Sequence, residues 1–534
     1  MELIGEIIDL IYQNEINSYT IANLECEKEI VTIVGYLPFI NIGDNLKVYG
    51  TFVEHKDYGT QFKVETFEKI MPQTVGALEK YLANGSIKGI GEVTAKKIIE
   101  KFGADTINVF KYEPEKLALI SGISEKKAID ISQSFIENWE VWEIVGFLGE
   151  YGIGPEYAKK IYDNLGINSI EEIKANPYIL IDMVRGIDFK QIDQFALNLG
   201  INLEDNKRIQ SGIKYALITA STNGHSCVVK ENLIEYVVTL LDVGEECIEN
   251  NLINLKANGE IVIEQRDENE WIYLQYFYNT EEEIAKLILR LDNSLNMKEI
   301  KNIDKELNKI EKKSEIELSE KQIECIKAIN ENNVTIITGG PGTGKTTIIK
   351  TIIELYQEKN KKIVLAAPTG RAAKKMTEAT GKEACTLHRL LCIGKIDDEA
   401  IYNKPNEYHG EPISADIIVI DELSMVDMFL MNYLLKCIYQ GTKLILVGDT
   451  DQLPSVGPGK ILKDLINSER ITTVKLDKIF RQAAKSKIIL NAHRVNCGEG
   501  FIQEIEQEMK EDFFFIKQNS IEKITQEILT LCNR

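Results

Sequence analysis

The first 75 residues alternate apolar and polar positions over several short runs. Leu46, Val48 and Phe52 alternate with polar side chains, and a second run of the same kind follows a turn-like segment at 56–59. Alternation with a period of two is typical of strands that bury one face, and several short strands in so few residues favour a small barrel. We therefore expect an OB-like β-barrel over residues 1–75, which either binds a ligand or has a purely structural role.

Residues 76–200 have a helical pattern and contain a repeated glycine turn. The four copies begin at Gly89, Gly122, Gly152 and Gly186, and successive starts are 30 to 34 residues apart. Each copy lies between helical segments, and the arrangement resembles tandem helix-hairpin-helix units. In such units, backbone N–H groups of the turn contact a nucleic-acid phosphate without reading the bases. The alternative is four packing hairpins whose lysines are solvated.

The four copies differ at the positions that would face a phosphate. The second copy has Ser124 where the first has its second glycine, and the fourth has Asp188, whose carboxylate would repel phosphate. Only the first and third copies have both glycines and a following lysine pair, so we expect copies two and four to be structural. The candidate DNA contacts are Gly89, Gly91, Lys96, Lys97, Gly152, Gly154, Lys159 and Lys160.

Residues 201–317 predict a mixed module and a linker. Two short β runs at 261–264 and 271–274 flank a polar turn at 267–269, after a mainly helical stretch. A helical body with a terminal hairpin favours a winged-helix-like module. Residues 291–317 are rich in Lys, Glu and Asn, which predicts a charged helix or linker.

The most informative stretch of the chain follows a β-branched run at 333–338. It has the pattern G-x-x-x-x-G-K-T and is followed by helix formers at 348–357. Strand, glycine-rich loop and helix in this order predict a P-loop, whose backbone N–H groups surround phosphate oxygens at a helix N-terminus. Lys345 would reach the β- and γ-phosphates, and Thr346 would offer its hydroxyl to Mg²⁺. The predicted nucleotide-binding residues of this loop are Gly339, Gly340, Pro341, Gly342, Thr343, Gly344, Lys345, Thr346 and Thr347.

A second apolar strand, 416–420, ends in a pair of carboxylates. This is the Walker B arrangement, in which Asp421 would hold Mg²⁺ through water. Glu422 would orient and deprotonate the attacking water. After the next apolar strand, Gln452 is placed to touch a γ-phosphate or its water, and Arg481 could stabilise transition-state charge as an arginine finger does.

Five further residues are candidates for nucleotide or DNA binding, and two of them, Gln322 and His388, have an alternative role. Gln322 precedes the P-loop, and its amide can donate and accept at once, which matches an adenine edge; a glutamine there can equally be a surface residue. Thr369, Gly370 and Arg371 follow a strand and could hold DNA phosphates. His388 is a DNA-contact candidate, with a core or capping histidine as the alternative.

Composition sets the broad class. A chain of 534 residues with 44% hydrophobic residues implies several packed domains. Nine scattered cysteines contain no C-x-x-C pair, which suggests neither a zinc ribbon nor an iron–sulfur cluster and fits a reducing cytosol. The net charge of −21 is weak counter-evidence to nucleic-acid binding, because charge acts within about 8–10 Å. The N-terminus lacks a signal-peptide pattern and no apolar stretch reaches the roughly 20 residues that span a membrane, so we expect a cytoplasmic protein without membrane contact.

The motor motifs in order resemble a superfamily 1 helicase. After the P-loop they are A-P-T-G-R-A-A, D-E-x-S-M-V-D, G-D-x-x-Q-L-P and I-F-R-Q, while T-L-H-R-L-L and S-M-V-D resemble the RecD-like branch. The barrel and the hairpin array resemble the long, stand-alone bacterial members of that branch. The resemblance implies ATP- and Mg²⁺-dependent DNA unwinding in repair or recombination, with 5′→3′ travel on single-stranded DNA. Single-stranded and tailed double-stranded DNA are the expected partners.

The resemblance also implies how the motor is divided. We expect an α/β RecA-like ATPase lobe over residues 318–470, with a β-hairpin pin near 392–412 that splits the duplex. Residues 471–534 would begin a second lobe that is incomplete, because no later helicase motif follows before Arg534. The chain is then expected to bind ATP but to unwind DNA poorly. Two alternatives stay open, a DNA-binding protein with a nucleotide-dependent switch and an inactive truncated helicase.

Overall fold

A computed structural model describes most of the chain as two compact units. The first unit is Met1–Tyr215 with Leu240–Asn251, and the second is Ala216–Thr239 with Leu252–Arg534. Outside the described residues are 15–18, 27–28, 38–39, 56–58, 71–77, 80–81, 84–86, 88, 150, 152, 155–156, 184–186, 295–298, 394–409, 479–485, 503–511 and 534, together with the side chains of 55, 69, 138, 142 and 182.

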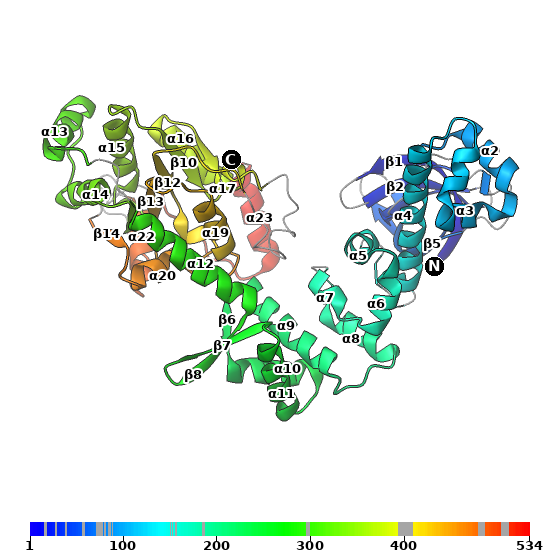
Figure 1. Cartoon of the computed structure of the whole chain (residues 1–534). Coiled ribbons are helices and arrows are strands. Elements are labelled where there is room, and N and C mark those ends of the chain that lie inside the picture. Colours follow the sequence, from blue (N-terminus) through cyan, green and yellow to red (C-terminus); the bar gives the residue numbers. More distant parts are fainter. Residues whose placement is uncertain are drawn as a thin grey trace. The chain divides into compact units, whose positions relative to one another are not determined.

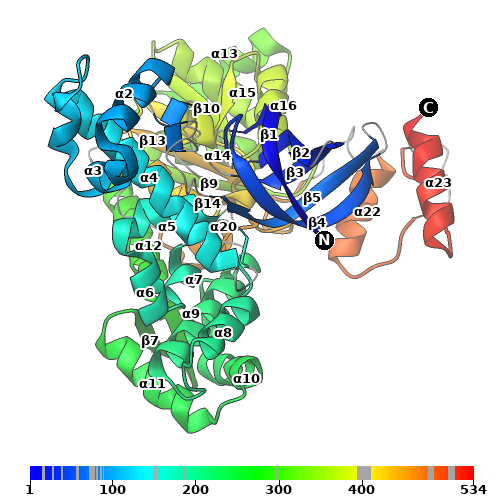
Figure 2. The same cartoon turned by 90° about the vertical axis from the view of Figure 1, so that its right-hand side faces the viewer.

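Five strands form a closed barrel at the start of the first unit (Figure 2). They are β1 (Glu2–Gln13), β2 (Tyr19–Cys26), β3 (Glu29–Tyr36), β4 (Asn45–His55) and β5 (Gly59–Lys69). The strand order is β1-β2-β3-β5-β4, and all neighbours are antiparallel except the parallel pair β3–β5. Leu24, Ile33 and Phe62 point inward and are fully buried. The expected barrel is confirmed, and it arises because alternate positions of each strand are apolar.

A helical region with its own apolar core follows the barrel. Its helices are α2 (Glu92–Phe102), α3 (Thr106–Tyr112), α4 (Glu125–Gly149), α5 (Ala158–Leu165), α6 (Ser169–Ala175), α7 (Ile179–Met183) and α8 (Phe189–Asn198), with 3₁₀ turns at Gly103–Asp105, Pro114–Leu119 and Gly166–Asn168. Ala95 and Ile98 of α2 are fully buried at helical spacing. The rings of Phe110 and Phe135 stack at 4.5 Å between centroids, which joins α3 to α4.

The next six elements are α9 (Asn206–Thr222), β6 (Cys227–Val229), α10 (Lys230–Leu241), α11 (Glu245–Ala257), β7 (Ile261–Arg266) and β8 (Asn269–Leu274). The strands form an antiparallel sheet in the order β6-β8-β7. Helix, strand, two helices and a terminal hairpin are the element order of a winged helix. The following α12 (Gln275–Asp292) and α13 (Ile303–Ser314) lead into the motor.

The motor is built on a six-stranded parallel sheet covered by helices (Figure 1). Its strands are β9 (Val334–Gly339), β10 (Ile363–Ala367), β11 (Ala384–Thr386), β12 (Ile417–Ile420), β13 (Lys443–Gly448) and β14 (Thr472–Leu476), in the order β11-β10-β12-β13-β9-β14. Every residue of β9, β12 and β13 is buried. Strands that are buried along their whole length are typical of parallel sheets with helices on both faces.

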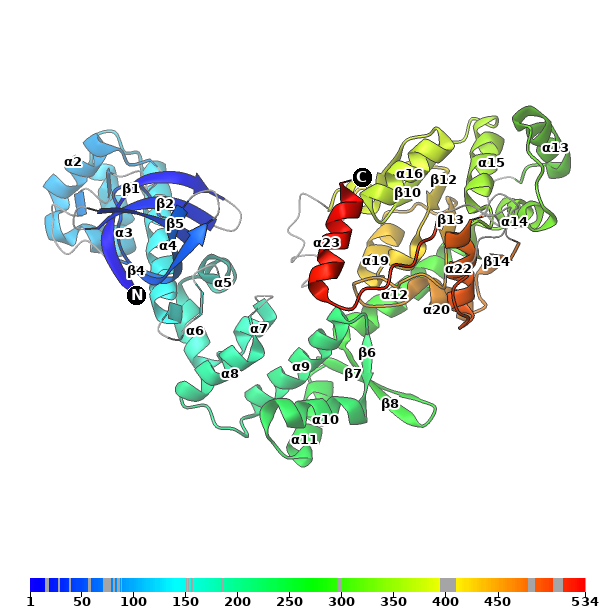
Figure 3. The ribbon, with the colours of Figure 1, turned by 180° about the vertical axis from the view of Figure 1, so that it is seen from behind.

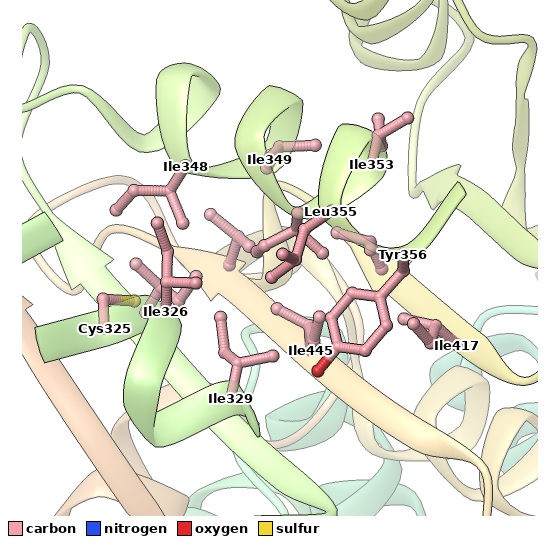
Figure 4. Close-up of a cluster of buried hydrophobic side chains, with 14 of the residues drawn as sticks. Cys325, Ile326, Ile329, Ile348, Ile349, Ile353, Leu355, Tyr356, Ile417 and Ile445 are labelled. Carbon is pink, nitrogen blue, oxygen red and sulfur yellow. The ribbon is translucent and has the colours of Figure 1, made fainter. Parts of the chain in front are cut away.

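The motor helices pack their apolar side chains against this sheet. They are α14 (Glu320–Glu331), α15 (Lys345–Gln357), α16 (Gly370–Thr380), α17 (Leu387–Leu390), α19 (Met428–Lys436) and α20 (Ile461–Asn467), with a 3₁₀ turn at Leu423–Met425. Figure 4 shows Ile348 and Ile353 of α15 and Ile326 of α14 in the same cluster as Ile417 and Ile445 of the strands. This core holds the two helices against the strands whose ends carry the phosphate loop and the acidic pair.

The expected lobe boundary at residue 470 needs correction. The strand β14 pairs in parallel with β9, for example Val474 with Ile337, so it is the sixth strand of the motor sheet. Its alternating buried residues Val474 and Leu476 join the core of that sheet. Beyond it, α22 (Lys487–Asn496) and α23 (Ile521–Cys532) can be followed in Figure 3. The expected pin near 392–412 lies mostly outside the described residues.

Candidate nucleotide and DNA sites

The phosphate loop connects the end of β9 to the first residue of α15. Gly342 and Gly344 have φ angles of +78° and +86°, a left-handed conformation that side chains with a Cβ rarely adopt. Gly344 is the N-cap of α15, and no side chain caps this helix. The glycines therefore serve a backbone shape that leaves N–H groups at the helix start available to a phosphate.

The side chain of Lys345 is held inside the loop by backbone carbonyls of the loop itself. Its Nζ donates to the carbonyl oxygens of Gly339 and Gly340, the second at 3.2 Å. Burial lowers the pKa of this ammonium, and the carboxylates of Asp449 and Asp421 oppose that shift. A partly desolvated cation beside uncovered N–H groups is the donor set that binds phosphate oxygens.

Asp421 and Glu422 follow β12, the strand that pairs with β13 and β10 in the centre of the sheet. Glu422 has φ +56°, an unusual left-handed conformation for glutamate, and its N–H donates to Asp421 Oδ1 at 2.9 Å. Non-glycine residues with such strained backbone are enriched at functional sites. Burial raises the pKa of both carboxyls, and the Asp421 charge raises that of Glu422 further. A base with a raised pKa is better matched to proton transfer near neutral pH.

Asp449 is a site residue that the sequence reasoning did not single out. It follows β13 directly and is buried, with 3% of its surface exposed, and its Oδ1 accepts from the N–H of Asp451 at 3.0 Å. Its charge acts on both Lys345 and Glu422. The signal was present in the sequence, because Asp449 ends an apolar strand just as Asp421 does.

These residues fit a nucleotide with a divalent cation. The glycine loop and Lys345 supply phosphate donors, while Thr346 and Asp421 supply oxygen ligands. Magnesium is commonly held by one or two protein oxygens together with substrate phosphates. The described residues contain no group of three or more His, Cys, Asp or Glu side chains that could hold a metal ion.

Gln322 is placed beside the loop, with both ends of its amide engaged. Its Oε1 accepts from the N–H of Ser319 at 2.9 Å as part of a capping box at the start of α14. Its Nε2 lies 3.4 Å from the carbonyl oxygen of Gly344, and the side chain is buried. The structure thus shows Gln322 supporting the phosphate loop, and an adenine contact would require these bonds to be exchanged.

The remaining motor candidates in the described part of the chain lie on or near the same edge of the sheet. Gln452 is exposed in the loop after β13, and Arg481 lies outside the described residues. Thr369 caps α16 by accepting from the N–H of Ala372 at 3.2 Å. Gly370 and Arg371 at the start of α16, and His388 in α17, are exposed. His388 is therefore not a core residue.

In the helical region, the first hairpin has an open helix start. Gly89 has φ +93°, and Gly91 is the N-cap of α2 with no side-chain cap. Lys96 and Lys97 of α2 are exposed, and Lys97 Nζ lies 3.3 Å from the carbonyl oxygen of Ser121.

Hairpins two and four have helix starts that are occupied by side chains. Ser124 Oγ accepts from the N–H of Lys127 at 3.2 Å, and Asp188 Oδ1 accepts from the N–H of Lys190 at 3.2 Å. Capping side chains use the N–H groups that would otherwise contact a phosphate.

The third hairpin is described only in part. Gly152 lies outside the described residues, while Gly154 is half-buried before α5. Lys159 is exposed on α5 and Lys160 is half-buried. Burial raises the pKa of Asp163 on the same helix, and the Lys159 charge opposes the shift.

A cavity of about 1090 Å³ lies apart from the phosphate loop. It is lined by elements of the winged-helix-like module, by α12 and by α20, and its lining contains no residue of the P-loop or of the acidic pair. In the described part of the chain, no helix is long and apolar enough to cross a membrane.

Four family models match the chain in succession. They are the OB-fold domain of ATP-dependent DNA helicase YrrC at 1–72, a SAM-like helix-hairpin-helix tandem at 82–134, the HHH domain of ATP-dependent RecD2 DNA helicase at 137–227 and an AAA domain at 322–458. The last of these contains the P-loop and the acidic pair.

Curated proteins similar to this chain include a RecD2 DNA helicase and RecD subunits of the RecBCD enzyme. The ATP-dependent RecD2 DNA helicase of Deinococcus radiodurans is 30% identical over 498 residues, which cover 90% of this chain and 67% of that protein. The RecBCD enzyme subunit RecD of Buchnera aphidicola is 33% identical over 254 residues, covering 38% of this chain and 41% of that protein. The crystal structure of Pif1 helicase from Candida albicans aligns with 31% of this chain and 41% of that chain at 26% identity, with a TM-score of 0.24.

The site and its sheet define a P-loop motor of the helicase class, preceded by a barrel and a helix-hairpin-helix array. Within that class, the match over nine tenths of the chain decides the family. The chain belongs to the RecD2 family of ATP-dependent DNA helicases.

Proposed function

We propose that this chain couples ATP hydrolysis to 5′→3′ travel on single-stranded DNA and to separation of a tailed duplex. The observation that supports it most is the arrangement at the carboxyl edge of the motor sheet. There the loop cation Lys345 lies within electrostatic reach of Asp421, Glu422 and Asp449, beside an uncapped helix start.

Each residue of the site has a proposed role. Lys345 binds the β- and γ-phosphates after exchanging its bonds to Gly339 and Gly340. Thr346 and Asp421 hold Mg²⁺, which when bound would neutralise phosphate charge. Glu422 takes the proton of the attacking water, a role that suits its raised pKa.

Three further residues complete the proposed reaction site. Gln452 contacts the γ-phosphate or its water from the loop after β13. Arg481 supplies positive charge to the transition state. Gln322 contacts the adenine after exchanging its bonds to Ser319 and Gly344.

DNA is held at two places in this proposal. In the motor, Thr369, Gly370, Arg371 and His388 contact the travelling strand near the edge of the sheet. In the helical region, the first and third hairpins grip phosphates with the N–H groups of uncapped turns and with their lysines. Such contacts are independent of base sequence.

Strand displacement tests the proposal, with polarity as the readout. Two duplexes of identical sequence carry a single-stranded tail at either the 5′ or the 3′ end, and each is incubated with the chain, ATP and Mg²⁺. We expect displacement from the 5′-tailed duplex and none from the 3′-tailed one, whatever the absolute rate. Equal displacement of both, or a preference for the 3′ tail, would contradict the proposed direction.

A further inference from the structure

His493 on α22 lies against the phosphate loop, although it is 152 residues away in sequence. Its Nε2 is 3.4 Å from the carbonyl oxygen of Pro341. A Cβ built on Gly340 would lie 2.6 Å from His493 Cε1 and 3.2 Å from Nε2. The imidazole therefore packs directly on the Gly340–Pro341 turn.

This contact explains a glycine that the P-loop pattern does not require. The pattern G-x-x-x-x-G-K-T leaves its second position free, and that position is Gly340. Unlike Gly342 and Gly344, Gly340 does not have a left-handed backbone. The three atoms that a Cβ at Gly340 would meet first all belong to His493. Position 340 therefore has no side chain because the imidazole of His493 occupies that space.

The helix that carries His493 is fixed by several bonds. Ser486 caps α22 by accepting from the N–H of Ile489 at 3.4 Å, and Asp512 accepts from the N–H of Lys487 at 2.9 Å. The buried Asn491 binds both the N–H and the carbonyl of Ile502, at 2.7 and 3.3 Å. The ring is consequently placed by a held helix rather than by a free loop.

The carbonyls of the turn have three side-chain partners. Lys345 donates to Gly339 and Gly340, Thr343 Oγ1 donates to Gly340 at 2.8 Å, and His493, when protonated at Nε2, can donate to Pro341. If Lys345 leaves these carbonyls to bind phosphate, as the proposed function requires, Thr343 still binds Gly340 and His493 still binds the carbonyl of Pro341. We propose that His493 is a positioning residue for nucleotide binding, which couples the shape of the phosphate loop to α22.

A double-mutant cycle tests this role. It measures the affinity of the whole chain for mant-ATP, a fluorescent ATP analogue. His493→Ala removes the ring, and Gly340→Ala displaces it without straining the backbone. Each single variant should bind roughly three- to tenfold more weakly, the effect of losing one neutral hydrogen bond. The double variant should be no weaker than either single one, because the added methyl group then occupies the space that the ring has left.

Val495→Ala is the matched control, since Val495 is 52% exposed on the same helix, and it should bind like the wild type. Losses that add in the double variant, or single variants with wild-type affinity, would overturn the role of His493 while nucleotide binding itself stands. A wild-type chain that binds no mant-ATP would instead overturn the proposed function and this role with it.

Discussion

The starts of α15 and α2 both lack a capping side chain, but they differ in backbone conformation and in surroundings. Both helices begin at a glycine N-cap without a capping side chain, Gly344 and Gly91. The start of α15 faces Lys345 and three acidic side chains, with strained backbone nearby at Glu422. The start of α2 is exposed, and the charges nearby are the exposed Glu92 of its first turn and the exposed lysines Lys96 and Lys97. A glycine N-cap without a capping side chain thus lies in the proposed reaction site in one place and on an exposed surface in the other.

The difference in burial and in nearby charges determines what each site can do. A catalytic site needs charges that are held before the reaction begins, and burial strengthens their effect. An exposed helix start with exposed lysines can hold a phosphate but cannot direct a reaction, and its binding weakens as salt rises. Substitutions in the site at the start of α15 should therefore lower ATP binding or hydrolysis, while substitutions near the start of α2 should lower DNA binding.

Glu422→Gln should have the largest effect on hydrolysis. The amide keeps the size of the side chain but cannot accept a proton, so the turnover number for ATP should fall roughly 10²- to 10⁴-fold. Affinity for mant-ATP should stay near that of the wild type. Steady-state phosphate release and equilibrium binding measure the two effects separately. Wild-type turnover in this variant would remove Glu422 from the reaction.

Lys345→Ala should act on binding itself. Loss of a charge-assisted bond of about 1.5–3 kcal/mol predicts roughly 10- to 150-fold weaker nucleotide affinity. Isothermal titration with ATP and Mg²⁺ checks it, with Lys350→Ala, an exposed lysine of the same helix α15, as control. A variant at position 345 that binds ATP like the wild type would refute the nucleotide site.

Neutralising the lysines of hairpins one and three should weaken DNA binding without affecting ATP affinity. Each lost phosphate contact should lower the slope of log affinity against log salt by about one. The variant set is Lys96, Lys97, Lys159 and Lys160, each changed to Ala. The matched set changes Lys126, Lys127 and Lys190 near the capped starts of α4 and α8. Fluorescence anisotropy with a labelled oligonucleotide should show a reduced slope for the first set only; equal losses would remove the distinction between the hairpins.

Asp421→Asn should stabilise the nucleotide-free chain. Burial raises the pKa of Asp421 above its ordinary value, so the folded state favours the protonated acid. The stabilisation from protonation is present at low pH and is lost as pH rises through the raised pKa. The Tm of the Asn variant should exceed that of the wild type at neutral pH, and the gap should shrink on acidification. Thermal unfolding at several pH values checks this, and a lower Tm for the variant at neutral pH would contradict it.

The smallest expected effects are on the free energy of unfolding, from substitutions at two helix starts of the helical region. Asp188→Ala removes a cap and should lower the free energy of unfolding by about 1 kcal/mol. Gly91→Ala should change it by only a few tenths, because the backbone there is extended and no atom lies within 4 Å of the new Cβ. Urea denaturation measures both. A large loss of stability at Gly91 would show that this start is structural too.

Much of the architecture could be predicted because it depends on local pattern. Alternating residues such as Leu46 and Val48 predicted the barrel, and the spacing from Gly339 to Thr346 predicted the loop of the motor. The inequality of the hairpins was visible in Ser124 and Asp188, which the structure shows as capping residues.

What could not be predicted depends on contacts between distant segments. The sheet includes Thr472–Leu476 because these residues pair with β9, which no local pattern indicates. Gln322 has the expected position beside the loop, but its capping bonds to Ser319 depend on the exact start of α14. His493 has no motif of its own, and only the fold brings it to Gly340.

Hydrolysis of ATP with and without a single-stranded oligodeoxynucleotide tests the central claim most directly. The account predicts that DNA raises the rate of phosphate release by the wild-type chain and that Glu422→Gln removes both the basal and the stimulated rate. A wild-type rate that does not respond to single-stranded DNA would contradict the claim that the site at Lys345 and Glu422 is the motor of a DNA helicase.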